Sequence, residues 1–330
     1  MKINYLEYDY LSFMDGFVDE RFWVKLWFRI NPKFLLMPMF PDFLPKLTAS
    51  LTESISIDFA QNIQSESIFT PLISQPINTT FLSKGQGGTP ILLLHGFDSS
   101  ILEFRRILPL LAIQNKTLAV DLLGFGFTDR LPNLKVNPGA IGTHLYYFWK
   151  SLINQPIILV GASMGGAVAI DFTLNYPEVV QKLVLIDSAG LKNNPIISKF
   201  IFPPLDYLAT EFLRRPQVRD NISRSAYFDK SFASSDANIC ARLHLEMPGW
   251  NKALISFTKS GGYGSFKQKL HLIQQQTLIL WGENDNILGV GDADKFVKAI
   301  ANSELIWIPS CGHVPHLEKS EITANYILDF

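Results

Sequence analysis

Ser163 stands between two glycines, in the sequence G-A-S-M-G at positions 161–165. A serine hydroxyl becomes a good nucleophile when a histidine accepts its proton and a carboxylate holds that histidine. Two later segments offer these groups: G-E-N-D ends at Asp285, and P-S-C-G-H ends at His313. These residue types, in this order, indicate attack of Ser163 on an acyl carbon through a catalytic triad.

The residues around Ser163 predict a sharp turn between a strand and a helix. Pro156–Val160 is a short apolar run with β-branched side chains, which is typical of a strand buried on both faces. Ala167–Leu174 is typical of a helix that ends before the next proline. Gly161 and Gly165 would let the turn close, and N–H groups at the helix start would face a negatively charged oxygen. The alternative to a nucleophile turn is a glycine-rich turn in which the serine has no function. The strand and the helix that flank Ser163 disfavour this alternative.

Asp285 and His313 also follow predicted strands directly. Gln276–Trp281 leads into the loop of Asp285, and Leu305–Ile308 leads into the loop of His313. The chain has six histidines, and His313 is the one that follows the last strand. The order and the positions therefore fit one site at the carboxyl end of a sheet.

Strands and helices alternate along most of the chain, which predicts an α/β fold with a doubly wound, mostly parallel sheet. The strand pattern stops between about Ser188 and Leu270, where aromatic, Arg and Ser residues are frequent and helical patches occur. This stretch is interpreted as an inserted helical cap. The predicted organisation is an aromatic-rich N-terminal extension (1–75), a first half of the core (76–189), the cap (190–270) and a second half of the core (271–330).

Composition excludes several function classes. The 330 residues carry a formal net charge of −1, which gives no reason to expect a nucleic-acid partner. The 2 cysteines cannot form a disulfide framework and favour a reducing compartment. The first residues do not resemble a secretory signal, and no apolar run is long enough to span a bilayer. We therefore expect a cytoplasmic protein.

Residues 19–31 predict an amphipathic helix. Trp23 and Trp27 would lie on its apolar face, and Arg21, Lys25 and Arg29 would form a basic stripe opposite. Such a helix can lie on an anionic membrane surface, as a peripheral contact, or pack on the core of its own protein. Both interpretations stay open from the sequence.

Five segments together resemble the α/β-hydrolase superfamily, in its serine-nucleophile branch with a helical cap. They are His95-Gly96-Phe97, Asp121–Gly126, Gly161–Gly166, Trp281–Asp285 and Gly312-His313. The resemblance covers about residues 76–330, and the block from Gly96 to Gly126 is most similar to poorly characterised members from cyanobacteria and chloroplasts.

The resemblance implies a role for each site residue. Ser163 would be the nucleophile, His313 the base and Asp285 the acid, and the backbone N–H groups of Phe97 and Met164 would form the oxyanion hole. His95, Gly161 and Gly165 would support these groups. Some members of the superfamily take their acid from the loop after the strand that follows the nucleophile. Asp187 lies in that loop and is therefore the alternative acid.

No cofactor or metal is expected. His313 and His316 have the spacing H-x-x-H, but no third residue has metal-like spacing, so His316 is interpreted as a packed histidine. Cys311 is interpreted as a buried thiol.

Two functions remain. The first is a serine hydrolase of the esterase or lipase kind, which cleaves an ester or thioester of a fairly apolar small molecule through an acyl-enzyme. The second is a non-catalytic or accessory protein that binds a lipid-like or pigment-like ligand. The complete set of triad residues favours the first, since a binding protein needs no ordered triad.

Overall fold

The computed structural model describes residues 39–192 and 204–330. The chain divides into a unit of residues 1–39 and a compact unit of residues 40–330, and the second unit is described below. The predicted helix at residues 19–31 lies outside the described residues. No helix in the described part of the chain is long and apolar enough to cross a membrane.

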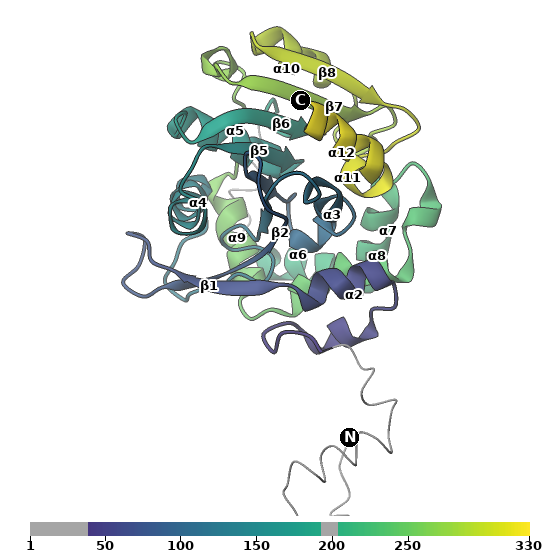
Figure 1. Cartoon of the computed structure of the whole chain (residues 1–330). Coiled ribbons are helices and arrows are strands. Elements are labelled where there is room, and N and C mark those ends of the chain that lie inside the picture. Colours follow the sequence, from purple (N-terminus) through teal and green to yellow (C-terminus); the bar gives the residue numbers. More distant parts are fainter. Residues whose placement is uncertain (1–38, 193–203) are drawn as a thin grey trace, which may run out of the picture. The chain divides into compact units, whose positions relative to one another are not determined.

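One 8-stranded sheet, in the order β1-β2-β4-β3-β5-β6-β7-β8, organises the compact unit (Figure 1). Its strands are β1 (Gln64–Ile68), β2 (Ile77–Lys84), β3 (Ile91–Leu94), β4 (Thr117–Val120), β5 (Ile157–Ala162), β6 (Val180–Ile186), β7 (Gln276–Gly282) and β8 (Ser303–Ile308). Strands β1 and β2 pair antiparallel with their neighbours, and all other pairs are parallel. The predicted fold class is therefore confirmed.

Helices cover both faces of the sheet. The core helices are α2 (Ser54–Gln61), α3 (Leu108–Leu111), α4 (Pro138–Leu152), α5 (Met164–Asn175), α10 (Ala293–Ala299), α11 (Pro315–Glu318) and α12 (Ser320–Asp329), with 3-10 turns η2 (Lys46–Ser50) and η3 (Ile101–Phe104). Strand β3 shows why two layers form, because successive side chains of a strand point to opposite faces. Leu92 and Leu94 join the apolar cluster that contains α4, α5 and α10 residues. Ile91 and Leu93 join the cluster that contains residues of α2, α3 and α12.

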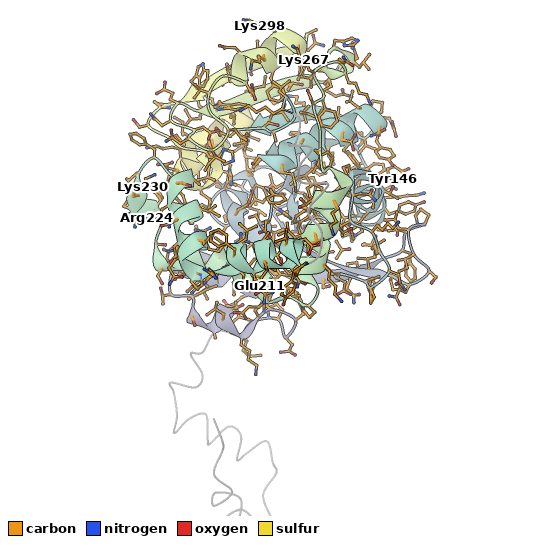
Figure 2. The ribbon with its side chains drawn as sticks, turned by 180° about the vertical axis from the view of Figure 1, so that it is seen from behind. Tyr146, Glu211, Arg224, Lys230, Lys267 and Lys298 are labelled. Carbon is orange, nitrogen blue, oxygen red and sulfur yellow. The ribbon has the colours of Figure 1, made fainter. Side chains whose placement is uncertain are left out.

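The described residues between β6 and β7 form helices without a strand, and these helices are called the cap below. They are α6 (Leu205–Arg214), α7 (Pro216–Ala226), α8 (Ser235–Cys240) and α9 (Trp250–Ser260), with 3-10 turns η5 (Lys230–Phe232), η6 (Leu243–Glu246) and η7 (Leu270–Leu272). Figure 2 shows the molecule from behind, with Glu211 of α6 and Arg224 of α7 labelled.

The sheet begins earlier than the expected core boundary at residue 76. Residues 64–68 form β1, which pairs with β2 from Gln64 opposite Phe81 to Ile68 opposite Ile77. The side chains of β1 are exposed except for Ile68, so the strand lacks the apolar pattern that marks the others. Residues 40–75 therefore belong to the compact unit and not to the predicted N-terminal extension.

Candidate active site

Ser163 occupies a strained turn between β5 and α5. Its φ of 53° and ψ of −119° lie outside the regions that L-residues prefer. A Cβ atom on Gly165 would lie 2.0 Å from the carbonyl oxygen of Leu94, and one on Gly161 would lie 2.2 Å from that of Gly165. Because backbone atoms cannot yield as a flexible side chain can, both positions require glycine. The turn holds Ser163, half-buried, at the carboxyl edge of the sheet.

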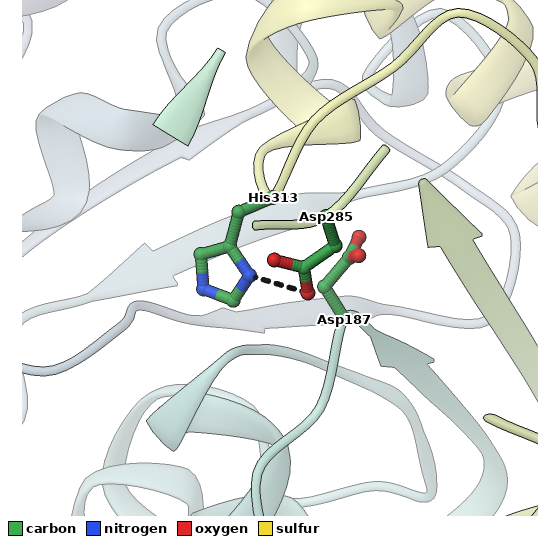
Figure 3. Close-up of side chains that lie close together, drawn as sticks. All are labelled: Asp187, Asp285 and His313. Atoms are coloured by element: carbon green, nitrogen blue, oxygen red, sulfur yellow. Dashed lines mark hydrogen bonds and ion pairs between the residues drawn. The ribbon is translucent and has the colours of Figure 1, made fainter. Parts of the chain in front are cut away.

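His313 and Asp285 are hydrogen-bonded to each other (Figure 3). The distance from His313 Nδ1 to Asp285 Oδ2 is 3.0 Å, and both side chains are buried. Asp285 Oδ1 accepts from the N–H groups of Ile287, at 2.7 Å, and Leu288, at 3.1 Å. Burial raises the pKa of Asp285, but the hydrogen bond and charge of His313 and these two N–H groups outweigh burial, so the pKa is lowered. Asp285 is therefore an anion that can orient His313 and stabilise its protonated form.

Asp187 lies against this pair. Its Oδ1 accepts from the N–H of Gly282 at 3.1 Å, and its side chain is fully buried. One ligand-type atom of each of Asp187, Asp285 and His313 lies within 4.8 Å of the other two. Burial, followed by the charge of Asp285, raises the pKa of Asp187 well above its usual range, which favours the protonated, neutral form of this carboxyl. His313 Nδ1 is hydrogen-bonded to Asp285, and this arrangement is typical of a site for acid–base chemistry.

The loop of His313 is fastened to the cap. His313 N–H donates to the carbonyl oxygen of Ala226, at the end of α7, over 2.7 Å. The buried carboxylate of Glu318 accepts from the N–H of Gly312 at 2.8 Å and from the N–H of Asp229 at 2.6 Å. Glu318 was not among the predicted site residues, since nothing in its sequence context shows which loop it meets.

The turn after β3 carries Phe97, the predicted oxyanion residue. His95 Nε2 accepts from the N–H of Leu122 at 3.0 Å, and Nδ1 donates to Gly96 O at 2.8 Å. Burial lowers the pKa of His95 to about 4, so the ring is neutral, as this pair of bonds requires. Glu103 Oε1 accepts from the Gly96 N–H at 3.0 Å. His95 and Glu103 therefore brace the turn from the core side.

The turn and the nucleophile adjoin each other. A Cβ atom on Gly96 would lie 3.4 Å from Cβ of Ser163. Among the hydrogen bonds of the described residues, none uses the N–H of Phe97 as a donor. Met164 is the first residue of α5, where the backbone N–H has no acceptor within the helix. Both N–H groups are thus available to a bound oxygen.

A cavity of about 370 Å³ opens at Ser163, between the core and the cap. Its wall is mostly apolar and consists of Phe97, Ser163, Met164, Ala167, Ala189, Phe257, Thr258, Gly262, Tyr263, Ile287 and Leu288. Phe257, on α9, packs edge-on against Phe125, with 5.3 Å between ring centroids. An apolar group of a ligand would therefore lie beside the serine hydroxyl.

The remaining candidates take supporting places. His316 is buried, and its Nε2 lies 3.6 Å from Glu103 Oε1. Burial lowers the pKa of His316 to about 3, so it is a neutral, packed histidine, as expected. Cys311 is fully buried, and burial raises its pKa, in keeping with an inert thiol. The contact between Ser163 and His313 is not among the hydrogen bonds of the described residues and stays a prediction.

Fold and site together define a hydrolase of the α/β type, and comparison with known proteins agrees. The family model described as "alpha/beta hydrolase fold" matches residues 89–320, and the chain belongs to this family. The predicted superfamily is thereby confirmed.

Named relatives share most of the chain. An α/β-hydrolase domain-containing protein, VTE7, of Arabidopsis thaliana is 34% identical over 300 residues, which cover 88% of this chain and 90% of the relative. The 2-hydroxy-6-oxo-6-(2'-aminophenyl)hexa-2,4-dienoic acid hydrolase of Metapseudomonas resinovorans is 30% identical over 263 residues, covering 77% and 87%. A solved thermophilic esterase from Thermogutta terrifontis has a TM-score of 0.69 at 23% identity, covering 81% and 97%, which shows the shared fold.

Proposed function

We propose that the protein is a serine hydrolase that cleaves an ester or thioester of an apolar small molecule. Ser163 attacks the acyl carbon, and His313 accepts the hydroxyl proton at Nε2. The N–H groups of Phe97 and Met164 bind the oxyanion of the tetrahedral intermediate. His313 then gives the proton to the leaving group, which leaves an acyl-Ser163. Water, activated by the same histidine, hydrolyses this acyl-enzyme and restores the serine.

The hydrogen bond between His313 and Asp285 carries this proposal. It directs the Nδ1 hydrogen toward the anionic Asp285, so Nε2 stays free to accept a proton. The strained turn at Ser163 supports it, because such strain persists where the surrounding structure demands one side-chain position.

The cavity supports an apolar substrate. Burying one methylene contributes about 0.8 kcal/mol, or about a fourfold gain in kcat/KM, while the chain still finds apolar wall. We therefore expect p-nitrophenyl esters to improve from acetyl to octanoyl. A flat profile would contradict an apolar acyl site.

The relative from Metapseudomonas resinovorans favours a second candidate, hydrolysis of a C–C bond in a dienoic acid of the kind that this relative's name describes. The same triad would serve both reactions, so assays with both kinds of substrate are needed to identify the bond that is cleaved. The accessory-protein alternative predicts no turnover of either.

The test compares the parent protein with Ser163→Ala on p-nitrophenyl esters and on a 2-hydroxy-6-oxo-dienoic acid. We expect ester turnover by the parent, labelling by a fluorophosphonate probe, and a loss of about four or more orders of magnitude in the variant. Equal ester rates for the two proteins would refute Ser163 as the nucleophile. Turnover of the dienoic acid alone would replace the ester proposal by the second candidate.

A further inference from the structure

Asp98, the residue after Phe97, is a buried carboxylate that receives three side chains of the cap. Its Oδ1 accepts from Trp250 Nε1 at 2.7 Å and from His244 Nε2 at 3.2 Å. Its Oδ2 forms an ion pair with Arg219. The three donors come from α9, η6 and α7, so separate elements of the cap converge on one group of the oxyanion turn.

Charge and burial make this cluster strong. Asp98, Arg219, His244 and Trp250 are all more than nine-tenths buried. Burial raises the pKa of Asp98, but the hydrogen bond of His244 and the charge and hydrogen bond of Arg219 outweigh it, and the pKa falls well below its usual range. Burial lowers the pKa of His244, which is therefore a neutral donor through Nε2. Charge-assisted hydrogen bonds to an ionised, desolvated carboxylate are among the strongest in proteins.

The backbone at Asp98 explains why such a clamp is needed. Its φ of 49° lies in the left-handed region, which a non-glycine residue adopts only at a cost. The turn is held on the core side by Glu103, through the N–H of Gly96. The N–H of Phe97 lies between this bond and the Asp98 clamp, so both anchors determine where it points.

We propose that Asp98 is a positioning residue of the oxyanion hole, through which the cap holds the Phe97 N–H toward the cavity at Ser163. This inference rests on the proposed function. It adds that a correctly seated cap is a condition for transition-state stabilisation, whether or not the cap touches the substrate.

The chain offers a matched control. Asp236, on α8 of the cap, is also a buried carboxylate that joins cap to core: it accepts from the Thr52 N–H at 3.0 Å and from the Glu53 N–H at 2.8 Å. It contacts no residue of the oxyanion turn among its described hydrogen bonds. Asp98→Asn and Asp236→Asn thus each weaken one cap anchor, and only the first concerns Phe97.

Steady-state kinetics on a p-nitrophenyl ester separate positioning from general stability. Since loss of one oxyanion donor costs about 10²–10³ in kcat, partial misorientation in Asp98→Asn should lower kcat by about 10–100-fold with little change in KM. Affinity for a boronic acid that mimics the tetrahedral intermediate should fall by a similar factor. Asp236→Asn should keep the parent's kcat. Equal kcat values for Asp98→Asn and the parent, or equal losses in both variants, would overturn the proposal.

Two further measurements test the proposal if Asp98→Asn does not fold or if the parent cleaves no ester. Trp250→Phe removes one donor to Asp98 and keeps a ring in place, so it should lower kcat several-fold even if Asp98→Asn does not fold. Hydrogen exchange of the full-length protein reads the turn without any turnover: the peptide 95–101 should exchange at least about tenfold faster in Asp98→Asn or Trp250→Phe, with β5 and β6 unchanged. Unchanged exchange would refute the positioning role of Asp98, whether or not the parent cleaves an ester. Absence of ester cleavage by the parent would refute only the proposed function.

Discussion

Replacement of Asp285 by Asn tests which carboxyl serves His313. Asp285 Oδ1 holds two backbone donors, the N–H groups of Ile287 and Leu288, while Oδ2 receives His313 Nδ1. An asparagine keeps its oxygen on the two N–H donors, so its NH₂ group must face His313. Nδ1 then becomes an acceptor and the ring hydrogen moves to Nε2, which can no longer take a proton from Ser163.

The expected loss follows from this change of tautomer. A triad with the wrong histidine tautomer loses about 10⁴ in kcat, which corresponds to about 5.5 kcal/mol of transition-state stabilisation. The shape of the site should be preserved, so KM and the unfolding midpoint should change little. A loss in kcat alone therefore distinguishes the chemical effect from a folding defect.

Asp187→Asn is the matched control, because both carboxyls lie within one cluster. The raised pKa of Asp187, caused by burial and then by the charge of Asp285, favours its protonated, neutral form. Asparagine is close in shape to a protonated aspartic acid and carries no charge. Its oxygen can still accept from the N–H of Gly282, so we expect less than about a tenfold loss in kcat.

Both variants should be assayed with a p-nitrophenyl ester at pH 8, beside Ser163→Ala. A mild Asp285→Asn together with a severe Asp187→Asn would refute the reasoning and move the acid to the loop after β6. Losses of about 10⁴ in both would mean that the two carboxyls act as one unit.

Three further predictions follow. Gly165→Ala should destabilise the protein by about 3 kcal/mol or more, since its Cβ would lie 2.0 Å from Leu94 O. Gly142→Ala, in α4, is the control: its Cβ would lie 3.9 Å from the nearest atom, so it should stabilise the protein by about 0.5–1 kcal/mol. Urea unfolding of both variants measures the difference. Burial raises the pKa of Glu103 to about 7, so the native state binds an extra proton between about pH 4.5 and 7, and its stability falls as pH rises through that window. Glu103→Gln should remove on the order of 3 kcal/mol of that fall, measured by urea unfolding from pH 4.5 to 8; identical pH profiles would contradict the raised pKa. If residues 19–31 contact membranes, full-length protein should pellet with anionic vesicles at low salt and a chain starting at Phe40 should not; equal sedimentation would exclude this contact.

The sheet could be predicted because its central strands are buried on both faces and flanked by glycine turns. β3, β5 and β7 are short apolar runs whose every residue, or all but the first, is buried. The turn at Ser163 was equally local, since two glycines and one serine define it. Such features leave their pattern within a few consecutive residues.

β1 left no such pattern. Four of its five residues are exposed, and its place is set by pairing with β2 rather than by its own side chains.

The site also contains residues that a local sequence pattern predicts and residues that it does not. Ser163, Asp285 and His313 could be predicted as candidates because each directly follows its own strand. Asp98 and Glu318 could not, because their partners lie 121 and 90 positions away in the chain, on the cap, and no spacing shows such a pairing. A local pattern therefore predicts the chemistry, whereas the groups that would orient it depend on how the helices between β6 and β7 pack on the core. The cavity at Ser163 depends on the same long-range packing, since Phe257 of the cap and Ile287 of the core both line it.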